Sequence, residues 1–313
     1  MRTPGHPGAR QNPPVSGNRV AAPRPDAYSR RMPITSRTGS RTLTPELCRH
    51  LDEWVGIQPL THDLHSGDVG WQLRFDDTTL LDSVLLWEAD GTVVAGGLLD
   101  GGGLRPAVAP THRGDPALAR AMAHTCDGLA YADVAPDTAL AAELRRRGWA
   151  PGPSPWSLLH RDLTPADRDR TDPLVRPLAG PDDVSARTAV QRSAFGARST
   201  FRPALWQRMS EGPTYDPRFD LVAWTVENQP VAAATGWFAG PGRCAILEPV
   251  GTHADHRRQG HGRRVNLAVM AALARAGASG VRVHTPAANA AAVATYVSCG
   301  LREVARTPTL FAP

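Results

Sequence analysis

The chain contains no lysine, so all 35 of its basic residues are arginines. This absence excludes a P-loop of the GK[ST] type, because that motif needs a lysine at the phosphates. It also excludes enzymes that use a lysine to form a Schiff base with a substrate or with pyridoxal phosphate. A conventional protein kinase is excluded for the same reason, since it pairs a lysine with the nucleotide phosphates.

Cysteine is also scarce, and its four residues, at positions 48, 126, 244 and 299, are far apart and form no C-x-x-C pair. We therefore expect neither a disulfide framework nor a zinc ribbon. The sequence has no long apolar run and no signal-peptide segment, which predicts a cytoplasmic protein without membrane contact. Free thiols are compatible with such a reducing compartment.

The net charge of +5 is concentrated in the first 40 residues. This segment has seven arginines and a single acidic residue, so it carries +6 and leaves −1 for the remaining 273 residues. It also has seven prolines and few apolar side chains, which predicts a disordered basic tail over residues 1–40. Nucleic-acid binding is disfavoured, because the rest of the chain is nearly neutral.

Two series of predicted elements follow the tail, one over residues 41–165 and one over residues 174–313, with a proline-rich, charged linker between them. Each series has the order hairpin, strand, helix, strand, helix ended by glycine, and strand. In the first series Asp90-Gly91 joins the hairpin strands, and Ser157–Leu163 is the closing strand. The shared order indicates a degenerate duplication.

The most informative stretch runs from Glu248 to Arg264. A predicted strand leads through a polar turn into Gly260-His261-Gly262 and then into an amphipathic helix. A helix N-terminus offers unpaired N–H groups and the positive end of the dipole, and glycines leave room for an anion. The nearby charges are Arg257, Arg258, Arg263 and Arg264. This pattern favours a pyrophosphate cradle; the alternative is a turn whose glycines serve the backbone and whose arginines are solvated.

The cradle is not a dinucleotide-binding fingerprint, because Val265 stands where the third glycine would be. Instead, Arg257-x-x-Gly260-x-Gly262 after a strand resembles the acetyl-CoA signature of the GNAT superfamily, the acyl-CoA-dependent N-acyltransferases. The run Asn289-x-x-Ala292-x-x-x-Tyr296-x-x-x-Gly300-Leu301 is similar to that family's penultimate helix, which usually ends in Tyr-x-x-x-Gly-Phe. The segment from Val175 to Phe195 resembles the family's first strand and helix.

The resemblance covers about residues 174–305 and implies an α/β (α+β) fold. Two GNAT-like domains are expected, each a mixed, mostly antiparallel twisted sheet flanked by helices. The first series departs from the pattern, since Pro116 and Leu118 stand where glycines are needed and residues 137–147 hold no tyrosine. The resemblance thus implies a degenerate domain at 41–165 and a catalytic domain at 174–313, a tandem arrangement similar to actinobacterial acyltransferases of the mycothiol-synthase type.

In this family the acetyl-CoA lies between two splayed parallel strands, which are here Leu247–Thr252 and Gly280–His284. The first strand would pair with the pantetheine arm, and one of its N–H groups would polarise the thioester carbonyl. Asn289 is expected to contact the cofactor arm or, alternatively, to cap its helix. The cofactor-binding residues implied are Val250, Gly251, Thr252, Arg257, Arg258, Gln259, Gly260, His261, Gly262, Arg263 and Asn289.

Two residues are candidates for proton transfer. Tyr296 would protonate the leaving thiolate; the alternative is a tyrosine at the edge of the core. Glu248 would take the amine proton through water; the alternative is a solvated or ion-paired strand residue. His253, His256 and His284 are alternative bases. The loop histidines lack regular ligand spacing, so no metal site is expected.

Trp206 and Tyr215 are candidate contacts for the acceptor, whereas Trp224 and Trp237 lie on predicted strands and are expected to pack in the core. The hypothesis is direct transfer of an acetyl group from acetyl-CoA to a primary amine of a small molecule, in a ternary complex. The alternatives are acetylation of a peptide or protein amine and a non-catalytic acyl-CoA-binding module.

Overall fold

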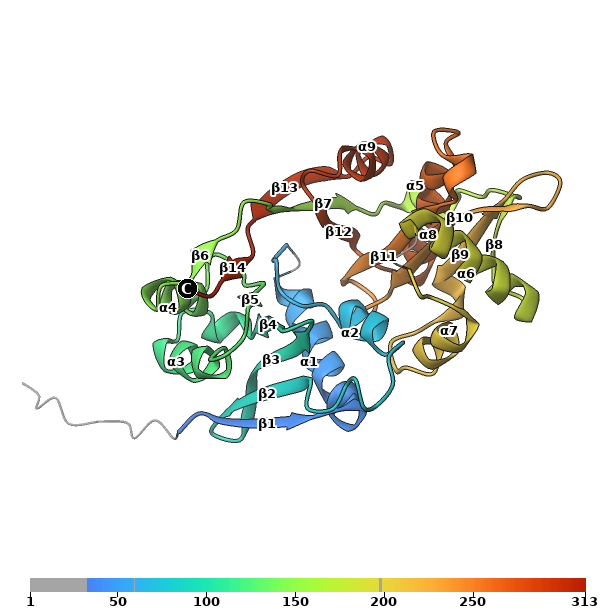
Figure 1. Cartoon of the computed structure of the whole chain (residues 1–313). Helices are drawn as coiled ribbons and strands as arrows, with labels where there is room; N and C mark the ends of the chain where they lie inside the picture. Colours follow the sequence, from blue (N-terminus) through green and yellow to red (C-terminus); the bar gives the residue numbers. More distant parts are fainter. Residues whose placement is uncertain (1–32, 59, 197–198) are drawn as a thin grey trace, which may run out of the picture. The chain divides into compact units, whose positions relative to one another are not determined.

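Two mixed sheets, each flanked by helices, make up the computed structural model, which describes residues 33–58, 60–196 and 199–313 (Figure 1). Residues 33–313 form one compact unit. Each sheet contains one parallel pair, β4 with β5 in the first and β11 with β12 in the second, among antiparallel pairs. The predicted fold class is therefore confirmed.

The first sheet has the spatial order β1 (Thr35–Gly39), β2 (Val84–Ala89), β3 (Thr92–Asp100), β4 (Gly103–Val108), β5 (Tyr131–Ala132), β14 (Leu310–Phe311) and β6 (Ala150–Pro151). Its helices are α1 (Thr44–Ile57), α2 (Ser66–Gln72), α3 (Pro116–Thr125) and α4 (Ala139–Arg146). The predicted β2–β3 hairpin is confirmed. Both turn residues have positive φ, 51° at Asp90 and 72° at Gly91, as a two-residue turn of type I′ requires.

The second sheet has the spatial order β13 (Arg302–Thr307), β7 (Trp156–Asp162), β12 (Gly280–Pro286), β11 (Cys244–Thr252), β10 (Pro230–Trp237), β9 (Asp220–Trp224) and β8 (Val175–Pro177). Its helices are α5 (Pro165–Arg168), α6 (Pro181–Phe195), α7 (Pro203–Ser210), α8 (His261–Ala276) and α9 (Ala290–Ser298). Short 3₁₀ turns lie at Arg41–Leu43, Pro110–His112, Pro217–Phe219 and Ala254–His256.

Strand β1 corrects the prediction of a disordered tail over residues 1–40. The strand pairs antiparallel with β2, from Thr35 opposite Glu88 to Gly39 opposite Val84. The Arg37 guanidinium also bonds Glu88 at 2.6 Å and Glu46 at 2.7 Å. These bonds hold a polar segment that has little apolar surface of its own. The rest of the predicted tail, residues 1–32, lies outside the described residues.

Two strands cross between the expected series. Strand β7 was predicted to close the first series, but it pairs with β12 along one edge and with β13 along the other. Conversely, β14 near the end of the chain lies between β5 and β6 of the first sheet. An apolar strand pattern does not specify which strand it pairs with, so the sequence could not assign β7 or β14 to a sheet. The domain boundaries at 41–165 and 174–313 remain predictions.

The core of the second sheet lies between its strands and α8. This helix turns Val265, Val269 and Leu273, each fully buried, toward the sheet. Trp224 and Trp237 are 5% and 1% exposed, which confirms that both pack in the interior. In the first sheet Trp87, Leu104 and Met122 are buried in the same way. The two cores fix the strand ends that frame the site described below.

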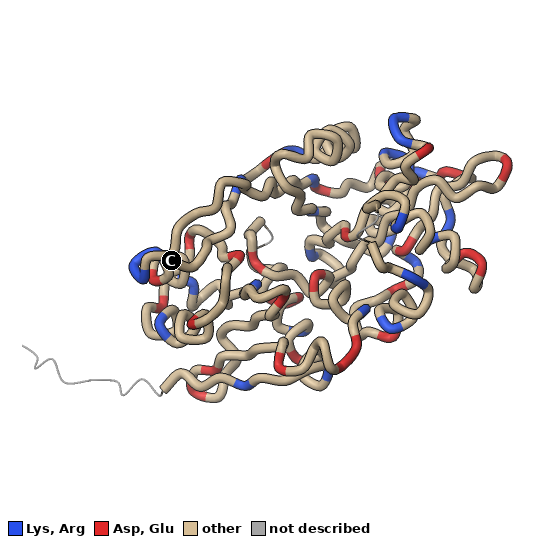
Figure 2. The backbone as a smooth tube through the Cα atoms, viewed as in Figure 1, with Lys and Arg blue, Asp and Glu red and all other residues tan. Residues whose placement is uncertain are grey.

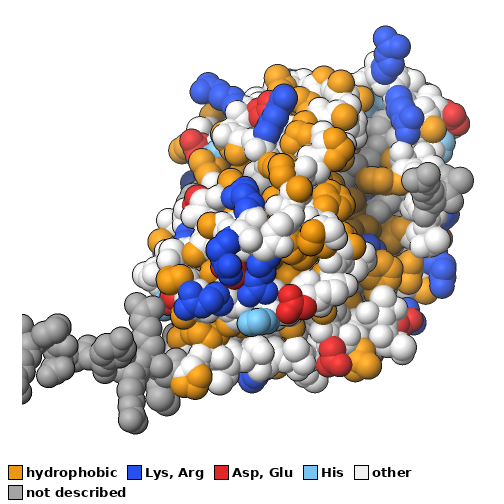
Figure 3. Space-filling model, turned by 60° about the vertical axis from the view of Figure 1, so that its left-hand side comes forward, with side chains coloured by type: hydrophobic (Ala, Val, Ile, Leu, Met, Phe, Trp, Pro, Cys, Tyr) orange, Lys and Arg blue, Asp and Glu red, His pale blue; other side chains and the backbone are white. Residues whose placement is uncertain are grey.

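Charged residues of both signs are interspersed along the described backbone (Figure 2). On the face shown in Figure 3, arginines stand beside acidic and apolar side chains. Within the described residues, no group of His, Cys, Asp and Glu side chains is arranged to hold a metal ion. None of the helices described there combines the length and the apolar character needed to cross a bilayer.

Candidate active site

A gap opens between β11 and β12. The two strands pair in parallel only where Cys244–Ile246 face Gly280–Arg282. Further along, β11 stays paired with β10, and β12 stays paired with β7. The predicted splay is therefore present, but on β12 it begins at Val283 rather than at Gly280. Backbone groups on the facing edges beyond this point are left for a ligand to pair with.

A β-bulge in β11 directs Glu248. Ala234 of β10 faces Val250, and Gly236 faces Leu247, so Glu248 and Pro249 together oppose the single residue Thr235. An extra residue in one strand bends it and turns a side chain away from its regular direction. The Trp237 indole N–H donates to the Glu248 carbonyl at 2.5 Å and fixes this bend.

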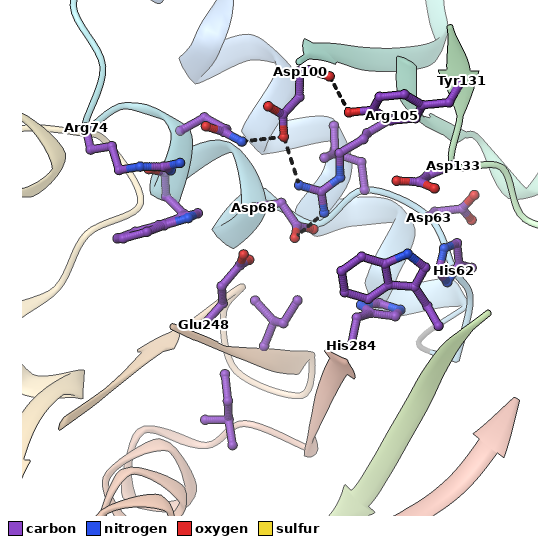
Figure 4. Close-up of a pocket in the computed structure, with 16 residues that line it drawn as sticks. His62, Asp63, Asp68, Arg74, Asp100, Arg105, Tyr131, Asp133, Glu248 and His284 are labelled. Atoms are coloured by element: carbon purple, nitrogen blue, oxygen red, sulfur yellow. Dashed lines mark hydrogen bonds and ion pairs between the residues drawn. The ribbon is translucent and has the colours of Figure 1, made fainter. Parts of the chain in front are cut away.

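Glu248 lines a cavity of about 320 Å³ (Figure 4). Its walls come from α2, the segments on either side of α2, strands β3 to β5, β11 and β12, and the start of β7. The lining residues are His62, Asp63, Leu64, Asp68, Trp71, Gln72, Arg74, Asp100, Arg105, Tyr131, Asp133, Trp156, Ile246, Leu247, Glu248 and His284. The part of the chain that precedes residue 165 thus supplies most of the polar wall.

Helix α2 reaches the second sheet because of its small residues. A Cβ at Gly67 would lie 2.4 Å from Cβ of Trp237, and one at Gly70 would lie 2.3 Å from Oγ1 of Thr214. His65 caps the helix by accepting the Gly67 N–H at Nδ1, and its Nε2 contacts the Cys244 carbonyl at 3.0 Å. The sequence Ser-Gly-Asp-Val-Gly therefore places the Asp68 side chain opposite β11.

Asp68 and Glu248 both line the cavity, and their carboxyl groups interact electrostatically. Burial and then the Asp68 charge raise the pKa of Glu248 to about 8, although Arg105 opposes this shift. Burial also disfavours charge on Asp68, but Arg105 overrides it and holds the pKa of Asp68 well below its usual range. The Arg105 guanidinium lies 2.6 Å from Asp68. At neutral pH Asp68 is therefore ionised, whereas Glu248 is mainly protonated.

Two histidines, His62 and His284, lie side by side on the cavity wall. The rings of His62 and His284 meet edge to face with centroids 4.8 Å apart. Burial lowers the pKa of His62 to about 4 and lowers that of His284 well below its ordinary value. Both rings are therefore neutral at physiological pH. The other candidate bases, His253 and His256, pair with each other before α8 and do not line the cavity.

Tyr296 lies on α9 within the core of the second sheet and is 7% exposed. Burial, and then the charge of Glu248, raise the pKa of its phenol above the ordinary value. The phenol therefore keeps its proton at any pH near neutrality. Tyr296 packs in the same core cluster as Leu247, the residue before Glu248, but it is not among the residues that line the cavity.

The predicted cradle residues surround the N-terminus of α8, where Gly260 is the cap with φ of 84°. A Cβ at Gly260 would meet no atom within 4 Å, so its conformation, rather than crowding, requires glycine. At Gly262 a Cβ would lie 3.0 Å from Oγ1 of Thr252 and 3.3 Å from Cγ2 of Thr295. Backbone conformation explains Gly260, and packing explains Gly262. The alternative interpretation, a turn whose glycines serve the backbone, therefore accounts for part of the pattern.

The four arginines of the cradle differ in their contacts. Arg264 forms an ion pair with Asp172 at 2.7 Å, so its charge is balanced within the chain. Arg257 donates to the Ala194 carbonyl at 2.8 Å, and Arg263 donates to the Ser298 carbonyl at 3.0 Å. These backbone contacts leave both charges in place, and Arg258 is exposed beside them. Three positive charges therefore border the N-terminus of α8.

The remaining predicted cofactor residues lie around the same helix end. Val250, Gly251 and Thr252 form the end of β11, and Gln259 is exposed in the turn. Nδ1 of His261 is buried and has no hydrogen-bond partner within the described residues. Asn289 caps α9 by accepting the Ala292 N–H at 3.2 Å, which confirms the capping alternative. Its contact with a cofactor arm remains a prediction.

The structure does not bring Trp206 and Tyr215 to the cavity wall. The Trp206 indole N–H donates to the buried Asp220 carboxylate at 2.9 Å, and the Tyr215 hydroxyl donates to the same oxygen at 3.2 Å. Both rings pack in an apolar cluster beside Trp237. Their role as acceptor contacts remains a prediction, while Trp71 on α2 supplies an aromatic wall that sequence reasoning missed.

The corresponding turn of the first sheet has a different arrangement. Asp115 accepts the N–H groups of Ala117 and Leu118, so a carboxylate of the chain itself caps α3. Arg113 pairs with Asp63 and with Asp137. A capped, negatively charged helix start is a poor anion site.

Sequence reasoning missed the cavity residues of the first series, of which Asp68, Arg74 and Arg105 are the charged ones nearest Glu248. One signal was available for Arg105, because it stands inside the apolar strand β4, where a charged residue needs a partner. The spacing of Gly67 and Gly70 was a second signal, since two glycines on one helix face permit a close approach.

Comparison with known proteins agrees with this geometry. Residues 190–301 match the model of the Acetyltransferase (GNAT) family, which confirms the predicted acyltransferase enzyme for this segment. No curated protein matches the chain. The fold is similar to that of an acetyltransferase of the GNAT family from Colwellia psychrerythraea (14% identity, 90% of this chain and 99% of that chain, TM-score 0.58).

Two further solved structures share the fold. One is a GCN5-related N-acetyltransferase from Sphaerobacter thermophilus, with 19% identity over 88% of this chain and 94% of that chain and a TM-score of 0.54. The other is described as a tandem GNAT protein from the clavulanic acid biosynthesis pathway, with 14% identity over 88% of this chain and 97% of that chain and a TM-score of 0.54.

Proposed function

We propose that this chain, whose residues 190–301 match the GNAT acetyltransferases, transfers an acetyl group from acetyl-CoA to a primary amine of a small molecule. The transfer is direct and takes place in a ternary complex. The observation that carries the proposal is the gap between β11 and β12, which is bordered by the α8 N-terminus and adjoins the cavity that holds Glu248.

The residues around the gap fit an acyl-CoA donor. The unpaired strand edges suit the amide groups of a pantetheine arm, and the α8 N-terminus with Arg257, Arg258 and Arg263 suits a diphosphate. The buried Nδ1 of His261 also lacks a partner within the described residues. When bound, acyl-CoA supplies the activated acyl group.

The chain's own residues would then move two protons. Glu248, once deprotonated, accepts a proton from the ammonium form of the acceptor, so that the neutral amine forms the new N–C bond as the C–S bond breaks. A backbone N–H of Val250–Thr252 donates to the acyl oxygen as negative charge develops there. Tyr296 would supply the proton that the departing thiolate takes up, and the second proton that the nitrogen loses as the amide forms would return to Tyr296.

The cavity supports a small acceptor rather than a peptide. Its volume of about 320 Å³ is at the lower end of the range for small-molecule sites. Both series of elements line it, so a bound acceptor would be held between them. Catalysis is favoured over a purely binding role, because the carboxyl groups of Glu248 and Asp68 both line the cavity that adjoins the gap.

We further propose a tandem arrangement in which the first series no longer binds acyl-CoA and instead completes the acceptor site. Strands β4 and β5 pair in parallel, as β11 and β12 do. The side chain of Asp115 caps α3, whereas no side chain caps α8. The likeness to actinobacterial enzymes of the mycothiol-synthase type remains a prediction. So does the cytoplasmic location, with which the four buried free cysteines are compatible.

The test is thiol release from acetyl-CoA in the presence of a panel of amines that includes free amino acids, small biogenic amines and short peptides. Release that depends on a small amine supports the proposal, and release only with peptides would favour the peptide alternative. Binding of acetyl-CoA without release for any amine would favour the binding module. Glu248→Gln is the control variant, and it should bind acetyl-CoA but release little thiol.

A further inference from the structure

Arg74 lies at one end of the cavity, just beyond α2 (Figure 4). Its guanidinium carbon is 4.0 Å from the ring centroid of Trp71 and 4.1 Å from that of Phe75. Nη1 donates to the Trp71 carbonyl at 2.7 Å. Two aromatic rings and one carbonyl thus hold a planar cation in a fixed position beside the cavity.

The two arginines of the cavity differ in how their charge is balanced. Arg105 lies 2.6 Å from Asp68 and 4.0 Å from Asp100. Within the described part of the chain, no carboxylate oxygen lies within 4.0 Å of the Arg74 guanidinium, although Glu248 and Asp100 act on it from farther away. The Arg74 guanidinium therefore has no direct ion-pair partner among the described residues, and its charge is available to a bound anion.

A partly buried cation without a counter-charge is costly, so such groups commonly serve a ligand that brings the charge. The planar fork of arginine matches a carboxylate or phosphate, with which it can form two parallel hydrogen bonds. Its aromatic contacts restrict the guanidinium and reduce the entropy lost when an anion binds. The alternative is that Arg74 only packs between Trp71 and Phe75.

We propose that Arg74 binds an oxyanion group of the acceptor, which is therefore an amine that also carries a carboxylate or a phosphate. This inference rests on the proposed acetyl transfer and names its substrate class. Because Glu248 and Arg74 line the same cavity of about 320 Å³, the amine and the oxyanion are separated by only a short linker. Free amino acids and short aminoalkyl phosphates fit this description.

The test compares matched acceptor pairs that differ only in the oxyanion: tryptophan with tryptamine, tyrosine with tyramine, and phosphoethanolamine with ethanolamine. The full chain and its Arg74→Gln, Arg74→Lys and Arg49→Gln variants are assayed for thiol release from acetyl-CoA. Arg49 is an exposed residue of α1 and serves as the control. The assays are run at about pH 9, where Glu248 is deprotonated. A shift in the pKa of Glu248 caused by the altered charge at position 74 then has little effect on the rate.

We expect the anionic member of at least one pair to be the better acceptor. Arg74→Gln should raise its KM about tenfold or more with little change in kcat, leave the KM of the neutral member unchanged, and behave differently from Arg49→Gln. Arg74→Lys should give an intermediate KM. Equal use of both members, an equal rise in KM for both, or no reaction with any pair while CoA still binds would overturn the anion site.

Calorimetry with CoA separates this inference from the proposed function. If the unaltered chain binds no CoA, the acetyltransferase proposal fails, and with it the premise of the acceptor class. If CoA binds normally to the chain and to Arg74→Gln, a negative result with the acceptor pairs counts against Arg74 alone. A thermal unfolding curve like that of the unaltered chain shows that Arg74→Gln is folded.

Discussion

Glu248 and Asp68 are two carboxyl groups that line the same cavity. A negative charge on either group disfavours ionisation of the other. Arg105 favours the ionised form of Asp68, because its guanidinium lies 2.6 Å from that carboxylate. The result is an ionised Asp68 and a Glu248 whose pKa is raised to about 8. A group with this pKa is a base whose strength is matched to an amine acceptor near neutral pH.

The rate of acetyl transfer should rise with pH through about 8, because Glu248 accepts a proton only after losing its own. In Asp68→Asn the negative charge that raises this pKa is gone, and Arg105 then acts more strongly on Glu248. The rise should therefore move to lower pH. A pH profile of kcat/KM measures it, and an unchanged profile in Asp68→Asn would remove Asp68 from this role.

Replacing Tyr296 by Phe keeps the ring in the core and removes only the hydroxyl. We expect kcat to fall by about 10²-fold, within the range for loss of a general acid, while the affinity for acetyl-CoA changes little. Steady-state kinetics and calorimetry give the two values. An unchanged kcat would show that another group or water protonates the thiolate.

At this scale the sequence could predict only part of the site. Glu248 and Tyr296 belong to a segment with a recognisable spacing, and the structure places Glu248 at the cavity and Tyr296 in the adjacent core. Asp68, Arg74 and Arg105 lie more than 140 residues earlier in the chain. Their approach to Glu248 depends on packing between the sheets, and the local signals, a charged residue within β4 and two glycines in α2, do not specify which strand they meet.

The elements around the gap combine a rigid frame with open edges. Strand β10 holds one side of β11, and β7 holds one side of β12, so neither strand can close the gap without losing an existing ladder. At its outer end α8 begins with Gly260 in a left-handed conformation, which turns the chain from the loop into the helix. The helix start is thus fixed before any ligand binds.

Gly260→Val should strain the loop, because a β-branched residue tolerates positive φ poorly. Gly242 is a matched control, since it also has positive φ, 73°, and a Cβ there would also meet no atom within 4 Å. Both variants should lose about 1–3 kcal/mol of stability. Only Gly260→Val should weaken CoA binding; equal affinities by calorimetry would show that the loop does not form the cradle.

A buried ion pair supports α6 against the second sheet. Arg187 and Asp220 lie 2.9 Å apart with side chains 1% and 0% exposed, and Thr235 bonds both. Arg187→Met leaves the Asp220 charge without its cation and should cost about 3–5 kcal/mol in denaturant unfolding. Glu53→Gln, which breaks an exposed pair with Arg49, should cost little. Equal losses would contradict the importance of burial.

Most elements could be predicted because their signals are local. Asp90-Gly91 specifies the hairpin turn, and Pro116 and Pro181 mark helix starts. The partner of β7 could not be predicted, because Leu158 and Leu159 are both buried and such a strand fits either sheet. Helix α2 was missed because its two glycines lower helix propensity.

In the whole unit, residues 33–313, the two series of elements hold each other through shared strands and a shared cavity. Strand β7 belongs to the second sheet and β14 to the first, so each sheet includes a strand from the other series. The buried Arg282 of β12 donates to the carbonyls of Thr61 and Asp63 beside the cavity. On this account the first series contributes acceptor-binding residues while the second binds acyl-CoA.

Titration of the full chain with CoA in a calorimeter tests whether the gap beside α8 is the acyl-CoA site and whether the first series lacks one. We expect one site per chain, with a salt-sensitive affinity because arginines border the diphosphate. Absence of binding, or two sites per chain, would contradict this expectation.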